Sequence, residues 1–397
     1  MEATDEHRYQ LFDAAMKKIV YVMDSLASKG GAERIVSEKM SWLVDVAGYE
    51  VHVVTCYQDS STMVNAYPLS QRVNQINLNI PYYSQYRYRY PSRLWVKWKL
   101  HRQLLRQLNL TVNMLNPDVL VSMGYFLADV VSCLPCKARK IVESHESRLF
   151  LMSDHGLSRG ILSKWFMSFY RSRYLRCVER NADVVVTLTH DDARHWAASR
   201  RVEVIPNFTI MTNTVQHDAA ARRVIAVGRL EWQKGFDRLI AAWQLIASRH
   251  PDWRLDIFGD GTLEQDLKRQ IAEAGLQQSA AIHPFTANIQ DEYAHSAVLA
   301  LSSRFEGFGL VLIEAMQNGV PCVVFDCPFG PSEVILDGQC GFVVADGDTK
   351  QFAEKLSQLM ADDNMRARFS ASAQERAKCY DQPTVMSQWE QLFNSLC

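Results

Sequence analysis

The sequence predicts an α/β protein that contains two Rossmann-like domains in tandem. Short apolar runs alternate with longer segments of helical periodicity in both halves of the 397-residue chain. Strands that are apolar throughout and alternate with helices form parallel sheets with both faces covered. Such strands are expected at 18–23, 51–56, 118–122, 140–144 and 183–187, and again at 224–228, 253–259, 297–302 and 321–326.

The first domain begins with a βαβ unit. A glycine-ended loop at 25–31 follows the first expected strand, and the helix expected at 32–47 leads into the second. Val204-Ile-Pro-Asn-Phe ends this series, and the polar segment 212–220 separates it from the second domain. Helices are expected there at 235–249, at 263–274 and after Gly309. In such sheets ligands bind at the carboxyl ends of the strands, where most of the motifs below fall.

The charge of the chain supports the same division. Residues 1–207 carry 27 Lys and Arg against 20 Asp and Glu, a net charge of +7. Residues 208–397 carry 16 against 24, a net charge of −8. Halves of opposite charge indicate domains with different partners. We expect an N-terminal domain at 16–206, a C-terminal domain at 207–382, and a disordered leader at the polar residues 1–15.

Several classes of protein lack support in the sequence. No apolar run approaches the length of a membrane span, and the N-terminus lacks a secretory signal. Nine scattered cysteines, an odd number, are typical of a reducing compartment, so a cytoplasmic protein is expected. The single C-x-x-C of Cys133 and Cys136 has no second pair beside it, which favours two ordinary thiols over a redox or zinc site.

The most informative motif is a pair of glutamates, Glu306 and Glu314, separated by a Gly-Phe-Gly turn and an apolar run. If a helix begins at these glycines, Glu314 shares a face with the helix start, because the spacing is a little over two turns. The free N–H groups of such a start bind phosphate well. The two carboxylates lie on either side of this helix start, where they can accept hydrogen bonds from sugar hydroxyls. This arrangement predicts a nucleotide-sugar site.

Two glycine-containing loops add to this site. Gly228-Arg229-Leu-Glu-Trp-Gln-Lys234-Gly235 follows the first strand of the second domain and can place two cations on a diphosphate. Alone, this loop could equally be a solvated turn. In the first domain, Gly30 and Gly31 precede a helix and permit close approach of the backbone to an anion. No G-x-G-x-x-G and no Walker A motif occurs, which disfavours a dinucleotide dehydrogenase and a P-loop enzyme.

Two further motifs are ambiguous. His145 follows an expected strand and could bind a sugar hydroxyl, although a single histidine is often structural. Asp346-Gly-Asp348 resembles a D-x-D metal site, but its place before the last helices indicates a turn. No metal or other cofactor is therefore expected.

Basic and aromatic residues alternate in segments 82–106 and 158–180, and no Asp or Glu occurs between Ser60 and Asn116. Lys and Arg mixed with Trp and Tyr suit an anionic membrane surface. A solvated helix face and a nucleic-acid patch are the alternatives. No nucleic-acid-binding motif supports the latter, so a membrane surface or a lipid-linked acceptor is the expected partner and nucleic acid is not.

Together these residues resemble the retaining glycosyltransferases of the GT-B fold, family 4 of the sequence-based classification. The resemblance rests on the glutamate pair, the loop of Arg229 and Lys234, the Gly-Gly-Ala-Glu-Arg start and the Ile-Pro-Asn linker, in the order of the family. It implies two domains that face each other across a cleft, with the last helix, 383–397, returning to the first domain. The stretch 326–335 is similar to a subgroup that makes bacterial surface polysaccharides and lipid-linked oligosaccharides from UDP-sugars.

The resemblance also implies roles for individual residues. Arg229 and Lys234 would bind the diphosphate, Glu306 the donor sugar and Glu314 the ribose. His145 would lie near the donor sugar. The remaining donor contacts would come from Gly30, Gly31, Gly228, Phe285, Phe308, Gly309 and Leu310.

Three other functions are alternatives to a glycosyltransferase. A phosphorylase of this fold would need a pyridoxal-binding lysine in a much longer chain. A sugar-nucleotide epimerase would lack the basic-aromatic segments. A non-catalytic glycan-binding protein would not need Arg229, Lys234, Glu306 and Glu314 together. The sequence therefore favours transfer of a hexose or N-acetylhexosamine from a UDP-sugar, without a metal, on the inner face of the cytoplasmic membrane.

Overall fold

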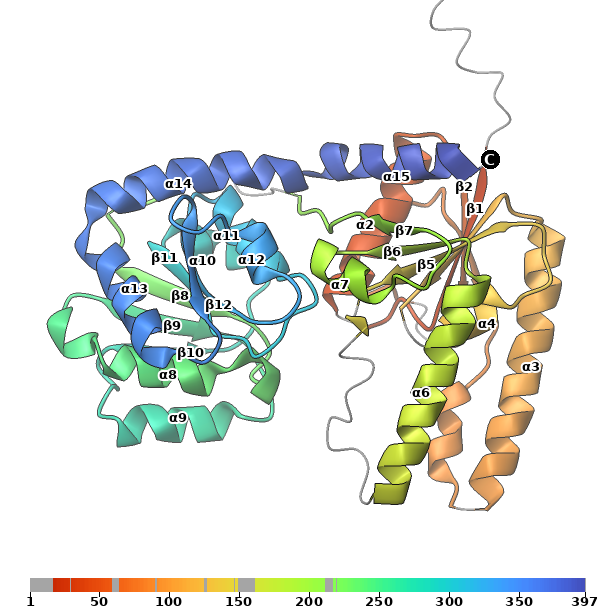
Figure 1. Ribbon diagram of the computed structural model, residues 1–397, viewed down its shortest axis with the longest axis horizontal. Helices are drawn as coiled ribbons and strands as arrows, with labels where there is room; N and C mark the ends of the chain where they lie inside the picture. Colours follow the sequence, from red (N-terminus) through yellow and green to blue (C-terminus); the bar gives the residue numbers. More distant parts are fainter. Residues whose placement is uncertain are drawn as a thin grey trace, which may run out of the picture. The chain divides into compact units, whose positions relative to one another are not determined.

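The computed structural model describes residues 17–28, 30–58, 64–89, 91–124, 127–145, 147–148, 161–210, 217–218 and 220–396, with only the backbone of 161–167 (Figure 1). The expected leader, 1–15, lies outside these residues. The chain forms two compact units. Unit 1 comprises Met1–Thr187, Ala193–Glu203 and Glu390–Cys397, and unit 2 comprises Leu188–Asp192 and Val204–Trp389.

A seven-stranded sheet forms the centre of unit 1, in the order β3-β2-β1-β4-β5-β6-β7. β1 pairs in parallel with β2 and β4, so that Tyr21 lies opposite Val53 and Val121. The parallel pairing that the apolar strands predict is thus present. The strands are β1 (Lys18–Met23), β2 (Glu50–Thr55), β3 (Asn74–Asn77), β4 (Val119–Met123), β5 (Arg139–Ser144), β6 (Val184–Thr187) and β7 (Val202–Val204).

Helices cover this sheet through narrow apolar stripes. Leu104, Leu108 and Val112 on α3 are buried at a spacing of four residues and pack with Val20 and Leu120 of the sheet. α6 packs through Leu175 and Val178 against strand residues of β5 and β6. Most of the surface of α3 remains exposed. The helices are α2 (Gly31–Asp45), η1 (Tyr82–Arg87), α3 (Ser92–Leu115), α4 (Ala128–Ser132), α6 (Ile161–Asn181) and α7 (His190–His195).

Unit 2 contains a six-stranded sheet in the order β10-β9-β8-β11-β12-β13, in which every neighbouring pair is parallel. The strands are β8 (Arg223–Val227), β9 (Arg254–Phe258), β10 (Ala280–His283), β11 (Val298–Leu301), β12 (Cys322–Asp326) and β13 (Gly341–Ala345). The two parallel-sheet halves confirm the predicted α/β fold class. β10 and β13, at the two edges, are strands that the sequence analysis did not identify.

Buried helical faces cover both sides of this sheet. Phe236, Leu239 and Phe352 belong to one apolar cluster with Val224, whereas Leu312 and Ile313 belong to another with Ile225. The α-helices are α8 (Phe236–Gln244), α9 (Glu264–Glu273), α10 (Ile289–Ala294), α11 (Leu310–Gln317), α12 (Pro331–Val334), α13 (Thr349–Ala361) and α14 (Asp363–Ala377). Short 3₁₀ turns are η2 (Trp232–Lys234), η3 (Ala247–Arg249) and η4 (Lys378–Tyr380).

The last helix, α15 (Gln382–Leu396), gives its first residues to unit 2 and its end, from Glu390, to unit 1. Within unit 1 the Lys17 Nζ donates to Asn394 Oδ1 at 2.8 Å, and Arg201 Nη1 donates to Ser395 Oγ at 2.9 Å. The ring of Phe393 meets that of Tyr49 edge-on at 6.1 Å. The end of the chain is thereby part of the first unit.

Candidate active site

Three loops of unit 2 converge at the carboxyl ends of β8, β9 and β11. Gly259 has φ +153°, and a Cβ there would overlap the carbonyl oxygen of Gly228. Gly235 has φ +64°, and a Cβ there would overlap the carbonyl oxygen of Ser302. Only glycine fits such contacts between backbones. The loop that carries Arg229 and Lys234 therefore lies directly against the run that carries Glu306.

Lys234 and Glu306 form an ion pair at this junction. Lys234 Nζ lies 2.8 and 3.0 Å from the two carboxylate oxygens of Glu306. Their side chains are 16% and 5% exposed. Ser303 Oγ donates to Glu306 Oε1 at 2.5 Å, and Ser302 Oγ donates to the carbonyl oxygen of Lys234 at 3.1 Å. The two residues that the sequence assigned to diphosphate and sugar are thus each other's partners here.

Arg304 forms hydrogen bonds that connect the same loops. Its guanidinium donates to both carboxylate oxygens of Asp237, at 2.8 and 2.6 Å, and to the carbonyl oxygen of Trp232 at 2.7 Å. Burial alone would raise the pKa of Asp237, but the hydrogen bonds from Arg304 reverse this and lower it. Gln233 Nε2 also donates to the carbonyl oxygen of Phe305 at 3.1 Å. These bonds hold η2, and with it Lys234, in place.

Arg229 presents its side chain to solvent at the edge of the pair. It is exposed, and its Nη2 lies 3.5 Å from Gln233 Oε1. In the described part of the chain no carboxylate lies within ion-pair distance of its guanidinium. Arg229 is therefore a cation available to an anionic ligand, whereas Lys234 already has an internal counterion.

α11 begins where the sequence predicts a helix start. Gly309 is its N-cap with φ +84°, and no side chain of the described residues caps it. Phe308, before it, is buried and meets Tyr380 edge-on at 5.8 Å. Glu314 lies one turn into α11, 5% exposed, and accepts from Tyr293 Oη at 3.3 Å. The N–H groups that begin at Leu310 are a ready anion-binding group.

Phe285 lies in the loop that follows β10. Its side chain is 68% exposed, and its N–H donates to Asp260 Oδ1 at 3.2 Å. Beside it, the ring of His283 stacks on Phe258 at 4.7 Å. An exposed aromatic ring at the carboxyl end of a strand suits stacking with a base, as the resemblance implies.

Asp346 and Asp348 have structural partners. Arg238 Nη1 donates to Asp346 Oδ1 at 2.7 Å, and Asp348 accepts from Gln351 N at 3.0 Å as the N-cap of α13. Asp348 thus serves as a turn and cap residue, as its position before the last helices indicates.

In unit 1, Gly30 is the N-cap of α2 in an extended conformation, with Gly31 as the first helical residue. A Cβ on Gly30 would overlap the carboxylate of Glu33, which folds back over the helix start. Glycine at this position therefore makes room for a side chain of the same helix.

His145 is one member of a buried polar cluster in unit 1. Its Nε2 lies 3.2 Å from Glu143 Oε2, and Lys39 Nζ lies 2.5 Å from the same oxygen. Lys39 and Glu143 are 1% and 3% exposed. Burial would raise the pKa of Glu143, but the charge of Lys39 and the bond to His145 outweigh it, so the pKa falls. Tyr21 lies alongside, with Lys39 Nζ 5.4 Å from its ring centre.

The sequence analysis missed most of these supporting residues. Lys39 carries the clearest signal, because it interrupts the apolar face formed by Val36, Met40 and Leu43 on α2. Ser303 and Arg304 lie just before Glu306 in the chain, but the sequence analysis gives them no role. Cys327 is buried near the ion pair, where burial, followed by the charge of Glu306, raises the pKa of its thiol. The stretch 326–335 contains Cys327, but the sequence analysis gives this residue no role.

Comparison with known proteins identifies the family. The model "Glycosyltransferase Family 4" matches residues 29–210, and the model "Glycosyl transferases group 1" matches residues 211–376. The amylovoran biosynthesis glycosyltransferase AmsD of Erwinia amylovora is 29% identical over 391 residues, 96% of this chain and 100% of that protein. Together the two models span 29–376, so that a family 4 domain is followed by a group 1 domain.

More distant similarities agree with this assignment. The N-acetylgalactosamine-N,N'-diacetylbacillosaminyl-diphospho-undecaprenol 4-alpha-N-acetylgalactosaminyltransferase of Campylobacter jejuni is 30% identical over 162 residues, 41% of this chain and 44% of that protein. The structure of HepE of Anabaena in complex with UDP-glucose matches with a TM-score of 0.69 at 19% identity, covering 95% of this chain and 99% of that one. The chain therefore belongs to the glycosyltransferases of the GT-B fold.

Proposed function

We propose that this glycosyltransferase moves a hexose or N-acetylhexosamine from a UDP-sugar to a lipid-linked or polysaccharide acceptor, with retention of the anomeric configuration, in the synthesis of a bacterial cell-surface glycan. The observation that carries the proposal is the pair of Lys234 and Glu306 beside the exposed Arg229 and the uncapped start of α11. AmsD, whose name places it in amylovoran biosynthesis, and HepE, which binds UDP-glucose, support the product class and the donor.

The chemistry follows from where charge develops. As the bond between C1 of the sugar and the phosphate oxygen breaks, negative charge grows on the diphosphate and positive charge on the ring. Lys234, Arg229 and the N–H groups at Leu310 stabilise the leaving UDP, and one such donor is worth ~3–4 kcal/mol. The acceptor hydroxyl attacks C1 from the same face and passes its proton to the leaving phosphate oxygen. Glu306 binds donor hydroxyls as its bond to Lys234 loosens.

A panel of nucleotide sugars tests the donor. A ligand at 100 times its Kd stabilises the native state by about 2.7 kcal/mol, so the preferred UDP-sugar should raise the melting temperature. Turnover should be unaffected by EDTA, and NMR of the product should show the anomeric configuration of the donor. Larger shifts with GDP- or ADP-sugars, or activity that EDTA abolishes and manganese restores, would contradict the proposal.

We further propose that the protein acts at the inner face of the cytoplasmic membrane. Within the described residues, no helix is both long enough and apolar enough to span a bilayer. Instead η1 and α3 expose aromatic residues, with Trp95 and Trp98 60% and 55% exposed. Mixed aromatic and basic side chains on one helix suit the interface of an anionic membrane.

Neutral replacements of Lys97, Lys99 and Arg102 should weaken binding to anionic vesicles, because each surface cation adds ~1 kcal/mol of attraction. Sedimentation with vesicles at low and high salt measures the effect, and the difference between wild type and variant should shrink as salt screens the charges. Unchanged sedimentation at low salt would remove the membrane proposal and leave the donor chemistry untouched.

A further inference from the structure

Unit 1 contains a cavity of about 1020 Å³ that none of the residues discussed for the donor lines. Its walls are α3 and α6, which run side by side in Figure 1, and its floor is α4. α3 is attached to the sheet by a single stripe of buried residues, so its flank stays open towards α6. The result is a groove between two helices.

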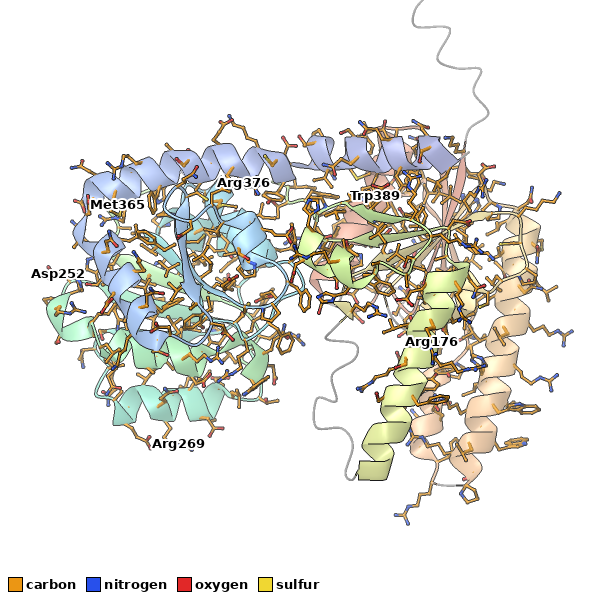
Figure 2. The ribbon with its side chains drawn as sticks, viewed as in Figure 1. Arg176, Asp252, Arg269, Met365, Arg376 and Trp389 are labelled. Atoms are coloured by element: carbon orange, nitrogen blue, oxygen red, sulfur yellow. The ribbon has the colours of Figure 1, made fainter. Side chains whose placement is uncertain are left out.

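Arginines dominate the walls of this groove. Arg173, Arg176 and Arg180 on α6 are spaced by three and four residues and thus share one face, and Arg176 is labelled in Figure 2. On α3, Arg102 and Arg106 lie one turn apart and line the opposite wall. Five arginine side chains therefore line one concave space.

The groove holds little negative charge to balance them. Asp129 is its one carboxylate among the described residues, and burial raises the pKa of that carboxyl group. In the described part of the chain no carboxylate lies within ion-pair distance of Arg106, Arg173 or Arg180. Arg102 instead lies over the Trp98 ring at 4.8 Å. Like charges at helical spacing repel one another, and a multiply charged anion relieves that repulsion.

Apolar side chains continue the groove. Leu105, Leu110, Phe169 and Tyr170 line it, and Phe169 and Tyr170 are about half exposed, at 52% and 46%. Arginine binds phosphate bidentately and packs its flat face on aromatic rings. A groove that offers both groups matches an amphiphile that carries phosphate next to a hydrocarbon chain.

We propose that this groove binds the diphosphate head group of a membrane-anchored lipid, the carrier of the acceptor glycan. This identity of the lipid rests on the proposed function. A flat anionic bilayer cannot enter a recessed groove, whereas a single head group can, and the forks of several arginines fit a diphosphate better than a diffuse surface charge. Lys97 and Lys99 of α3 lie outside the groove and contact the bilayer in general, whereas Arg102 lines the groove and contributes to both.

Farnesyl diphosphate is the probe for this site, because it joins a diphosphate to a short isoprenoid chain. Its binding is measured by calorimetry with UDP present at saturation, so that the donor's diphosphate site is filled. We expect farnesyl diphosphate to bind at least about tenfold more tightly than inorganic pyrophosphate, since the chain adds apolar burial. Farnesol, which lacks the charge, should not bind measurably.

The triple variant Arg106→Gln/Arg173→Gln/Arg180→Gln should bind farnesyl diphosphate at least about 100-fold more weakly, because charge-assisted hydrogen bonds to phosphate are lost. The matched control Arg87→Gln/Arg89→Gln/Lys99→Gln removes equal charge from exposed positions outside the groove and should bind as wild type. The single variants Arg106→Gln and Arg180→Gln should each bind farnesyl diphosphate more weakly than wild type, by a smaller factor than the triple variant. They test the proposal if the triple variant fails to fold.

Three results would overturn the proposal. Binding of farnesyl diphosphate would be undiminished in the folded triple or single variants, or the control variant would lose as much affinity as the triple variant. The third result is an affinity for pyrophosphate equal to that for farnesyl diphosphate, which would indicate a site for free phosphate. Failure of the donor assignment is a separate outcome. If no UDP-sugar shifts the melting temperature while farnesyl diphosphate binds in the groove, the proposed donor is wrong and the proposal of a lipid site in the groove remains valid.

Discussion

Replacement of Lys234 by alanine is expected to lower kcat by about 100- to 1000-fold, the range found when one preorganised donor to a developing anion is removed. The loss should be larger than that of an ordinary donor contact, because Glu306 would remain 5% exposed without its cation and would repel the diphosphate. Initial rates over a range of UDP-sugar concentrations measure kcat and KM separately.

A suitable control for this variant is Lys268→Ala. Lys268 forms an exposed ion pair with Glu264 on α9, at 2.6 Å. Its removal should leave turnover unchanged and cost at most about 1 kcal/mol of stability. Near-normal turnover by Lys234→Ala with a native circular dichroism spectrum would contradict the role assigned to Lys234.

Replacement of Lys39 by methionine is expected to lower the free energy of unfolding by about 3–5 kcal/mol, because it leaves the carboxylate of Glu143 buried without a cation. Urea unfolding followed by circular dichroism measures the change. The double variant Lys39→Met/Glu143→Gln, in which neither charge is buried, should recover much of the loss. Lys18→Met, which breaks the exposed pair with Glu50, is the control and should cost about 1 kcal/mol or less.

The same variant makes a prediction about pH. The folded pKa of Glu143 lies below its ordinary value of 4.5, so its ion pair stabilises wild type above that pH and loses its effect as the pH falls through the folded pKa. In Lys39→Met the carboxyl group of Glu143 keeps only its bond to His145, so its pKa should be higher than in wild type and it should be protonated first as the pH falls. The difference in stability between the two proteins should therefore narrow as the pH falls towards and below 4.5. A difference that is constant with pH would mean that lost packing, not charge, causes the destabilisation.

The sequence predicted the fold through its most apolar strands. β1, β4 and β12 are buried almost throughout, so their runs of Val, Ile and Leu stand out from the helices between them. β3, with the sequence Asn-Gln-Ile-Asn, was missed because an edge strand needs little apolar surface. β13 was missed because a glycine begins it, and glycine weakens the sequence pattern of a strand.

The candidate site was predictable in position but not in pairing. The Gly-Phe-Gly turn between Glu306 and Glu314 predicted a helix after Gly309, and α11 begins at Leu310 with Gly309 as its N-cap. The ion pair of Lys234 and Glu306 joins residues 72 positions apart, and the pair of Lys39 and Glu143 joins residues 104 apart. Only packing of the strands determines such distances. Similarly, the basic-aromatic composition of α3 and α6 was evident from the sequence, whereas the groove between them arises from how both helices pack on the sheet.

The contact of Gly259 with the carbonyl of Gly228 also bears on how tightly a donor can be held. The two loops are in contact through their backbones, and no side chain lies between them. No side-chain rotamers at this contact would therefore have to be fixed when a nucleotide binds. These two loops therefore lose little conformational entropy when the donor binds, so more of the interaction energy contributes to the affinity. An alanine at Gly259 would separate the two loops and restore the mobility that their contact removes.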